Sequence, residues 1–132
     1  MKILVSACLL GCPVRYDGRH KLSAEVAALR ERHELIPVCP ESECGLPVPR
    51  EPMTLTEGRL IGNVNGGDFT AMLAPWVVRK LDALAEVELD AAILKSKSPS
   101  CGRTGMFRQA FEKRFPQCRV LDENEVCDQS FE

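Results

Sequence analysis

The feature that most constrains the fold is an alternation of short apolar runs with segments of helical periodicity. The short runs are typical of buried strands, and the segments between them carry apolar residues three or four positions apart, as amphipathic helices do. This order predicts a three-layer, Rossmann-like α/β domain with a small, largely parallel sheet. The predicted strands cover 2–7, 34–39, 90–95 and 118–122, and the predicted helices cover 24–33, 70–86 and 105–115.

Local composition places these strands in the sheet. Residues 2–7 contain a short apolar run, which favours a central buried strand. Pro37 lacks a backbone donor, so the second strand is less suited to a central position. The last run, 118–122, is expected at an edge. Residues 40–58 are rich in Pro, Gly and Glu and are expected to form an ordered loop, followed by a short strand near 60–64.

Length and charge narrow the class of protein. A chain of 132 residues is long enough for one core, so we expect a single domain over 1–132. The net charge of −2 gives no general attraction to nucleic acid or anionic lipid, and we expect stable binding to neither. No apolar run is long enough to cross a bilayer. The N-terminal stretch lacks the features of a signal peptide, so we expect a cytoplasmic location.

Cysteine usage is the most unusual part of the composition. The chain has 7 cysteines, and an odd number argues against a framework made only of disulfides. Disulfides are also rare in a reducing cytoplasm. Metal binding or thiol chemistry therefore becomes the leading interpretation. For any single cysteine, the ordinary alternative is a small buried hydrophobic residue.

Three cysteines occupy equivalent places relative to the predicted strands. Cys8 follows the first strand, Cys39 ends the second, and Cys101 lies in the loop after the third. Because the carboxyl ends of parallel strands meet at one edge of the sheet, the fold should bring the three thiols together. Nearby Gly11, Gly45 and Gly102 would let the backbone approach a bulky inorganic group. Converging thiolates favour either zinc or an iron–sulfur cluster, and three ligands leave a coordination position open.

Three parts of the sequence carry distinctive motifs: SACLLG (6–11) with RYDG (15–18), PVCPE (37–41) with GLPVPR (45–50), and KSKSPSCG (95–102). Together these motifs resemble the signature of the 2-thiouracil desulfurase family. The resemblance covers about residues 1–104, whereas residues 105–132 do not show the family's usual tail.

This resemblance implies a cofactor and its ligands. In the family, three cysteines hold a 4Fe-4S cluster whose fourth iron stays open for the substrate's sulfur. The corresponding ligands are Cys8, Cys39 and Cys101, the same three that the strand positions select. Cys12 and Cys44 lie close to these residues in sequence, and either could act as a fourth ligand. Cys118 and Cys127 are assigned to packing or to the surface.

The resemblance also implies an activity, the hydrolytic desulfuration of a small thiolated molecule such as a thiouracil-like base. Glu41 would act as the general base for a water molecule, and Ser98, or alternatively Ser100, would assist. An iron–sulfur electron carrier and a metal-free thiol enzyme remain alternatives. A module that binds thiolated RNA is disfavoured, because the chain has neither a basic patch nor interleaved aromatic residues.

Overall fold

Four parallel strands form the main sheet of the computed structural model, which describes residues 1–127 and 129–131. Their order is β2-β1-β5-β6, so β1 is central and β6 lies at an edge, as the sequence predicted. Strand β2 is the other edge, where the missing donor of Pro37 is tolerated. The strands are β1 (Lys2–Ser6), β2 (Glu34–Val38), β5 (Ala91–Ile93) and β6 (Arg119–Leu121).

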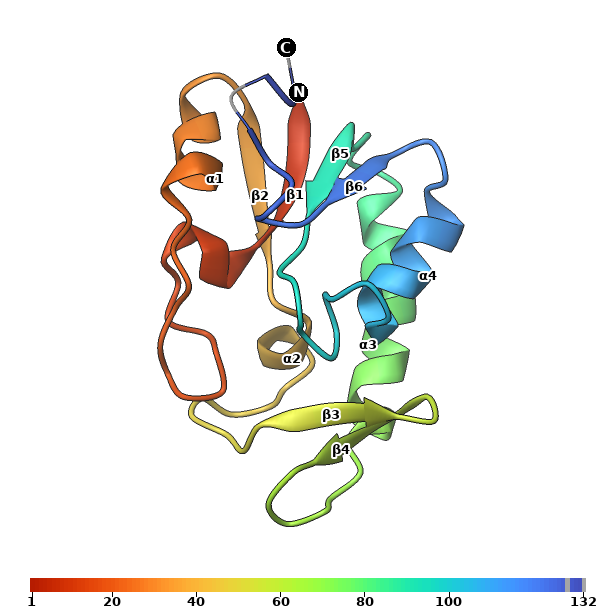
Figure 1. The fold of residues 1–132 in the computed structure, drawn as a ribbon. Helices are drawn as coiled ribbons and strands as arrows, with labels where there is room; N and C mark the ends of the chain where they lie inside the picture. The colour runs from red at the N-terminus through yellow and green to blue at the C-terminus, as the bar shows by residue number, and fades with distance from the viewer. Residues whose placement is uncertain (128, 132) are drawn as a thin grey trace.

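Helices cover both faces of this sheet, which confirms the α/β class (Figure 1). Helices α3 and α4 pack on one face, and α1 lies on the other. The alternation of side chains along β1 explains the two cores, since Leu4 joins the α3–α4 side whereas Ile3 and Val5 join the α1 side. The helical segments are η1 (Ala7–Leu10), α1 (Ala24–Ala28), η2 (Leu29–Glu31), α2 (Pro40–Glu43), α3 (Thr70–Leu84) and α4 (Met106–Arg114).

The first helix is shorter than its periodicity suggested. Ser23 caps α1 as expected, because its hydroxyl accepts a hydrogen bond from the backbone N–H of Val26. The helix then tightens into η2, where the N–H groups of Arg32 and His33 both bond to the Leu29 carbonyl. The predicted helix over 24–33 is therefore a short α-helix followed by a 3-10 turn.

A β-hairpin occupies part of the segment that the sequence assigned to a loop. Strands β3 (Met53–Thr56) and β4 (Arg59–Gly62) pair antiparallel and form a second, two-stranded sheet. The two turn residues, Glu57 and Gly58, both have positive φ values, as a type I′ hairpin turn requires. The loop prediction for 40–58 is wrong over α2, where Pro40 begins a helical turn, and over β3, where a two-residue turn ending in glycine was not read as a hairpin signal.

Among the described residues, none of the helices is both long enough and apolar enough to cross a membrane, including the longest, α3.

Candidate iron–sulfur site

An open cavity of about 940 Å³ lies at the carboxyl ends of strands β1 and β2, and the loop after β5 forms part of its wall. Strand order reverses between β1 and β5, and the crevice outside such a switch point is the usual ligand site of an open α/β sheet. Among the described residues that line the cavity, three are cysteines: Cys8, Cys39 and Cys101. The fold thus gathers the three thiols that lie far apart in sequence.

Each of these cysteines is held by a different element. Cys8 lies on η1, directly after β1, and Cys39 directly follows β2. Cys101 is 4% exposed in the loop that leads to α4. Burial raises the pKa of the Cys8 thiol to about 11, and the neighbouring Cys39 adds to this shift. Burial also raises the pKa of Cys101 to about 12. Both thiols are therefore weak acids until a metal displaces their protons.

The loop around Cys101 is ordered by its own backbone and by Ser98. The Ser98 hydroxyl accepts hydrogen bonds from the N–H groups of Ser100, at 3.2 Å, and Cys101, at 3.0 Å. A Cβ on Gly102 would lie 2.6 Å from the Ser98 carbonyl oxygen, so only glycine fits there. At Gly102, the close approach that the sequence suggested is therefore to the loop's own backbone.

Glu41 reaches the cavity by a route that the sequence did not predict. An extended segment would have aligned it with Cys39, but Pro40 begins the helical turn α2 at this point. The Glu41 carboxylate nevertheless lines the cavity. Its Oε2 accepts a hydrogen bond from the Ser100 hydroxyl at 3.2 Å, and its Oε1 lies 3.4 Å from Nε of Arg50.

Arg50 connects several walls of the cavity. Its side chain is 6% exposed, and besides Glu41 it donates to the carbonyl oxygens of Val14, at 3.0 Å, and Pro47, at 3.1 Å. Its backbone N–H donates to the Tyr16 carbonyl. The guanidinium therefore fixes the Glu41 carboxylate and the loop after η1 relative to each other.

The donor set suits a cluster. Three cysteine sulfurs are soft ligands of the kind that iron–sulfur clusters use, and the cavity has room for a small molecule beside them. Within residues 1–127 and 129–131, no group of three or more His, Cys, Asp or Glu side chains lies close enough to hold a single metal ion. A four-iron cluster is larger, and each of its thiolates binds a different iron.

Comparison with known proteins assigns this chain to a family. The model of the 2-thiouracil desulfurase family matches residues 3–122. The chain belongs to the 2-thiouracil desulfurase family. The protein YbbK of Bacillus subtilis (strain 168), which is described as uncharacterized, is 32% identical over 148 residues, covering 96% of this chain and 98% of YbbK.

A solved structure is similar as well. The structure of TudS, described as a 4Fe-4S-dependent thiouracil desulfidase, matches with a TM-score of 0.82 and 32% identity, over 95% of this chain and 92% of that chain. The family match extends past residue 104, where the expected resemblance ended, to residue 122. It thereby includes α4 and β6, which complete the main sheet and the α3–α4 layer.

The remaining cysteines of this desulfurase-family chain have other surroundings. Cys44 packs against the α3–α4 core, and its thiol donates to the Glu41 carbonyl at 3.2 Å. Cys118 is buried and donates to the Leu89 carbonyl at 3.3 Å, and Cys127 is exposed with its sulfur 3.4 Å from the Ser130 hydroxyl. Cys12 is half-buried in the turn after η1. These four are absent from the described residues that line the cavity.

Two cavity residues escaped the sequence argument. Ser6, the last residue of β1, accepts a hydrogen bond from the backbone N–H of Lys95 at 2.8 Å. Glu123 follows β6, in the part of the chain where the quoted motifs gave no signal. Ser6 belongs to the SACLLG motif, so the resemblance could have identified it as a site residue. No motif in the local sequence identifies Glu123 as one.

Proposed function

We propose that this protein removes sulfur hydrolytically from a small thiolated molecule, a thiouracil-like base, with a 4Fe-4S cluster held by Cys8, Cys39 and Cys101. Family membership supports this proposal, and so does the similarity to a structure described as a thiouracil desulfidase. The observation that carries it is a single cavity lined by three cysteines together with Glu41 and Ser100. The reducing environment that such thiols need supports a cytoplasmic location.

The reaction exchanges sulfur for oxygen without net electron transfer. A thiocarbonyl and water give a carbonyl and hydrogen sulfide, so the atoms balance with no oxidant or reductant. When bound through three cysteines, the cluster supplies an open iron that acts as a Lewis acid toward soft sulfur. The protein has to position the substrate, activate a water molecule and move its protons.

Glu41 is proposed as the group that takes a proton from the attacking water. Its carboxylate already has Arg50 on one oxygen and the Ser100 hydroxyl on the other. These contacts hold the side chain toward the cavity and leave further lone pairs on the oxygens for a water molecule. Ser100 is thus the serine that contacts the proposed general base, Glu41, directly. It is proposed to pass a proton between Glu41 and the bound substrate.

Ser98 is proposed to act through Ser100 and not on the substrate itself. Its oxygen accepts from two backbone N–H groups and lies 3.1 Å from the Ser100 hydroxyl. It therefore orients Ser100 and the Cys101 loop. This division assigns positioning to Ser98 and proton transfer to Ser100.

Anaerobic reconstitution tests the proposal. The purified protein is expected to contain about four iron and four sulfide ions per chain and to absorb broadly near 400 nm, as thiolate-bound 4Fe-4S clusters do. Incubation with 2-thiouracil or 4-thiouracil should release sulfide and form uracil in equal amounts. Uracil alone, and protein freed of iron by a chelator, serve as controls.

The same experiment separates the alternatives. A cluster that is reversibly reduced but releases no sulfide from thiolated bases would favour an electron carrier. A colourless protein that is inactivated by iodoacetamide would favour a metal-free thiol enzyme. The raised pKa values of Cys8 and Cys101 disfavour these two thiols as the nucleophile of such an enzyme, because a thiol nucleophile needs a lowered pKa.

A further inference from the structure

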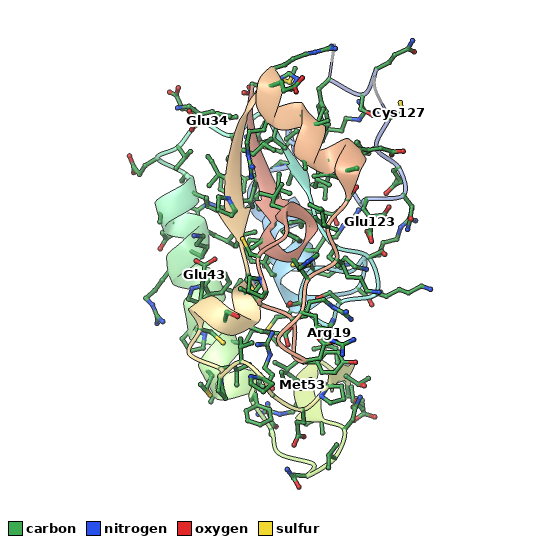
Figure 2. The ribbon with its side chains drawn as sticks, turned by 90° about the vertical axis from the view of Figure 1, so that its left-hand side faces the viewer. Arg19, Glu34, Glu43, Met53, Glu123 and Cys127 are labelled. Atoms are coloured by element: carbon green, nitrogen blue, oxygen red, sulfur yellow. The ribbon has the colours of Figure 1, made fainter. Side chains whose placement is uncertain are left out.

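A second polar network borders the cavity, apart from Glu41 and its partners. It joins Lys95 and Ser96, at the start of the Cys101 loop, to Glu123 on the segment after β6. Figure 2 shows Glu123 on the side of the molecule that carries α1. The network therefore links a cluster-binding loop to a part of the chain that lies outside the family match.

The Glu123 carboxylate receives three donors. Its Oε1 accepts from the backbone N–H of Ser96 at 2.8 Å, and its Oε2 accepts from the Ser96 hydroxyl and from Nζ of Lys95, both at 2.9 Å. The Glu123 side chain is 16% exposed. Burial alone would raise the pKa of Glu123, but the bonds from Ser96 and Lys95 hold it below its ordinary value. The carboxylate is thus ionised and held in one geometry.

The Lys95 ammonium group is equally constrained. Besides Glu123, it donates to the carbonyl oxygen of Ser96 at 2.9 Å and to the Ser96 hydroxyl at 3.3 Å. Its backbone N–H bonds to Ser6 at the end of β1. Three donors of the ammonium are therefore directed at fixed acceptors, which is unusual for a flexible lysine side chain.

Lys95 and Glu123 both line the cavity that contains Cys8, Cys39 and Cys101. Burial raises the pKa of the Cys8 thiol, and the positive charge of Lys95 opposes this shift in part. Three thiolates and a cluster concentrate negative charge in a partly buried cavity, where a fixed cation is less screened than on the surface. Positive charge near an iron–sulfur cluster stabilises its reduced, more negative state.

We propose that Lys95 and Glu123 are positioning residues of the cluster site: Glu123 clamps the Cys101 loop through Ser96 and holds the Lys95 ammonium at the wall of the cavity that the three cysteines line. This inference rests on the proposed function in that it assumes a cluster on Cys8, Cys39 and Cys101. It gives Lys95, after β5, and Glu123, after β6, the role of setting the charge and rigidity of that site.

The charge role is tested by the reduction potential of the cluster, measured at one pH on anaerobically reconstituted protein. Lys95→Met should shift the potential to more negative values, and Lys95→Arg, which keeps the charge, should restore most of the shift. Lys113→Met is the matched control, because Lys113 is an exposed lysine on α4 and is absent from the described residues that line the cavity. An unchanged potential in Lys95→Met, or an equal shift in Lys113→Met, would overturn this role.

The clamp role is tested by cluster retention and by hydrogen exchange. Glu123→Gln should release iron to a chelator about 10-fold faster than the wild type, as loss of an outer partner of a metal site typically does. In cluster-free protein, backbone amides of the 94–101 segment should exchange faster in Glu123→Gln, because the Ser96 N–H loses its charged acceptor. Glu34→Gln, an exposed carboxylate at the opposite end of the sheet, should match the wild type in both measurements.

The hydrogen-exchange arm keeps the clamp testable even when a variant holds no cluster. Wild-type exchange rates in Glu123→Gln would refute the clamp whatever the cluster content. Failure of the proposed function looks different: a wild-type protein with an intact cluster would release no sulfide, while the differences in potential and exchange between the variants would persist.

Discussion

The Ser100 hydroxyl donates a hydrogen bond to the Glu41 carboxylate, with 3.2 Å between Oγ and Oε2, across 59 positions of the chain. Ser100 is 1% exposed and belongs to the loop after β5, whereas Glu41 lies in the turn after β2. The contact joins two of the three segments that carry the candidate cluster ligands. Several expected outcomes depend on it.

Glu41→Gln should leave the iron and sulfide content near the wild-type level while the rate of sulfide release falls by a factor of about 100 to 10,000, which is typical for loss of a general base. The buried Arg50 loses its anionic partner, so the free energy of unfolding should also fall, by about 1–3 kcal/mol. Turnover on 2-thiouracil and a thermal melt measure the two effects. A fully loaded Glu41→Gln protein with undiminished turnover would remove Glu41 from the mechanism.

The two serines should behave differently when they are replaced. Ser100→Ala removes the donor to Glu41 and should lower turnover with the cluster retained. Ser98→Ala leaves the N–H groups of Ser100 and Cys101 without their acceptor, so it should weaken cluster retention as well. Iron release to a chelator, measured beside turnover, distinguishes them. Equal effects of both substitutions on both measurements would contradict the proposed division of roles.

Removal of any one of the three cavity cysteines should abolish the cluster. Cys8→Ala, Cys39→Ala and Cys101→Ala are each expected to lack the iron–sulfur absorption and the bound iron after reconstitution. Cys118→Ala and Cys127→Ala are the controls and should load normally, because the first thiol packs against the core and the second is exposed. Iron loss in a control, combined with retention in one of the three, would show that the ligand assignment is wrong.

Cys44 should be dispensable for the cluster. Its thiol bonds to the Glu41 carbonyl and its side chain packs against the core. Cys44→Ala and Cys44→Gly should both keep iron, sulfide and turnover, with Cys44→Gly less stable by about 1 kcal/mol because glycine has more backbone freedom in the unfolded chain. Loss of the cluster in both variants would identify a fourth ligand and favour an electron carrier.

Asp68 should make the stability of the protein depend on pH at acidic values. Hydrogen bonds from Thr70 and Arg59 lower the pKa of this carboxyl from 3.8 to about 2. Because the pKa is lower in the folded state, the carboxylate stabilises the fold above about pH 4, and this contribution disappears as the pH falls to about 2.

Urea denaturation of the wild type and of Asp68→Asn over a pH series measures this effect. The wild type should be more stable near neutral pH, and the difference should close between about pH 4 and pH 2. High salt should reduce it, since Asp68 and Arg59 are both solvent-accessible. A difference that stays constant over the whole pH range would show that the carboxylate's charge contributes nothing.

Much of the architecture could be read from local patterns. The apolar run of β1 and the helical stripe of α3 are strong periodic signals, and Ser23 marks the start of α1 through a hydrogen bond made within one turn. The positions of Cys8, Cys39 and Cys101 relative to the strands were also visible in the sequence. Parallel strands end at one edge of a sheet, so a one-dimensional order was sufficient to predict that these thiols converge.

The sequence was less informative where short local signals compete. Glu57 and Gly58 form the tight turn of a hairpin, but the surrounding Pro, Gly and Glu residues resemble a loop. Pro40 begins a helical turn, and this redirects Glu41 away from the extended geometry that the spacing from Cys39 suggested. In both places one residue's backbone preference decides the path, and composition averaged over a window conceals it.

The sequence by itself determined the α/β class, the central place of β1 and the candidate ligands, because each follows from periodicity or from position at the end of a strand. Only the tertiary structure decided which partners surround those ligands. Arg50 on Glu41, Ser100 rather than Ser98 at the carboxylate, and Glu123 on Ser96 are contacts between distant segments. Such contacts depend on how loops are oriented in three dimensions, and no spacing along the chain encodes that orientation.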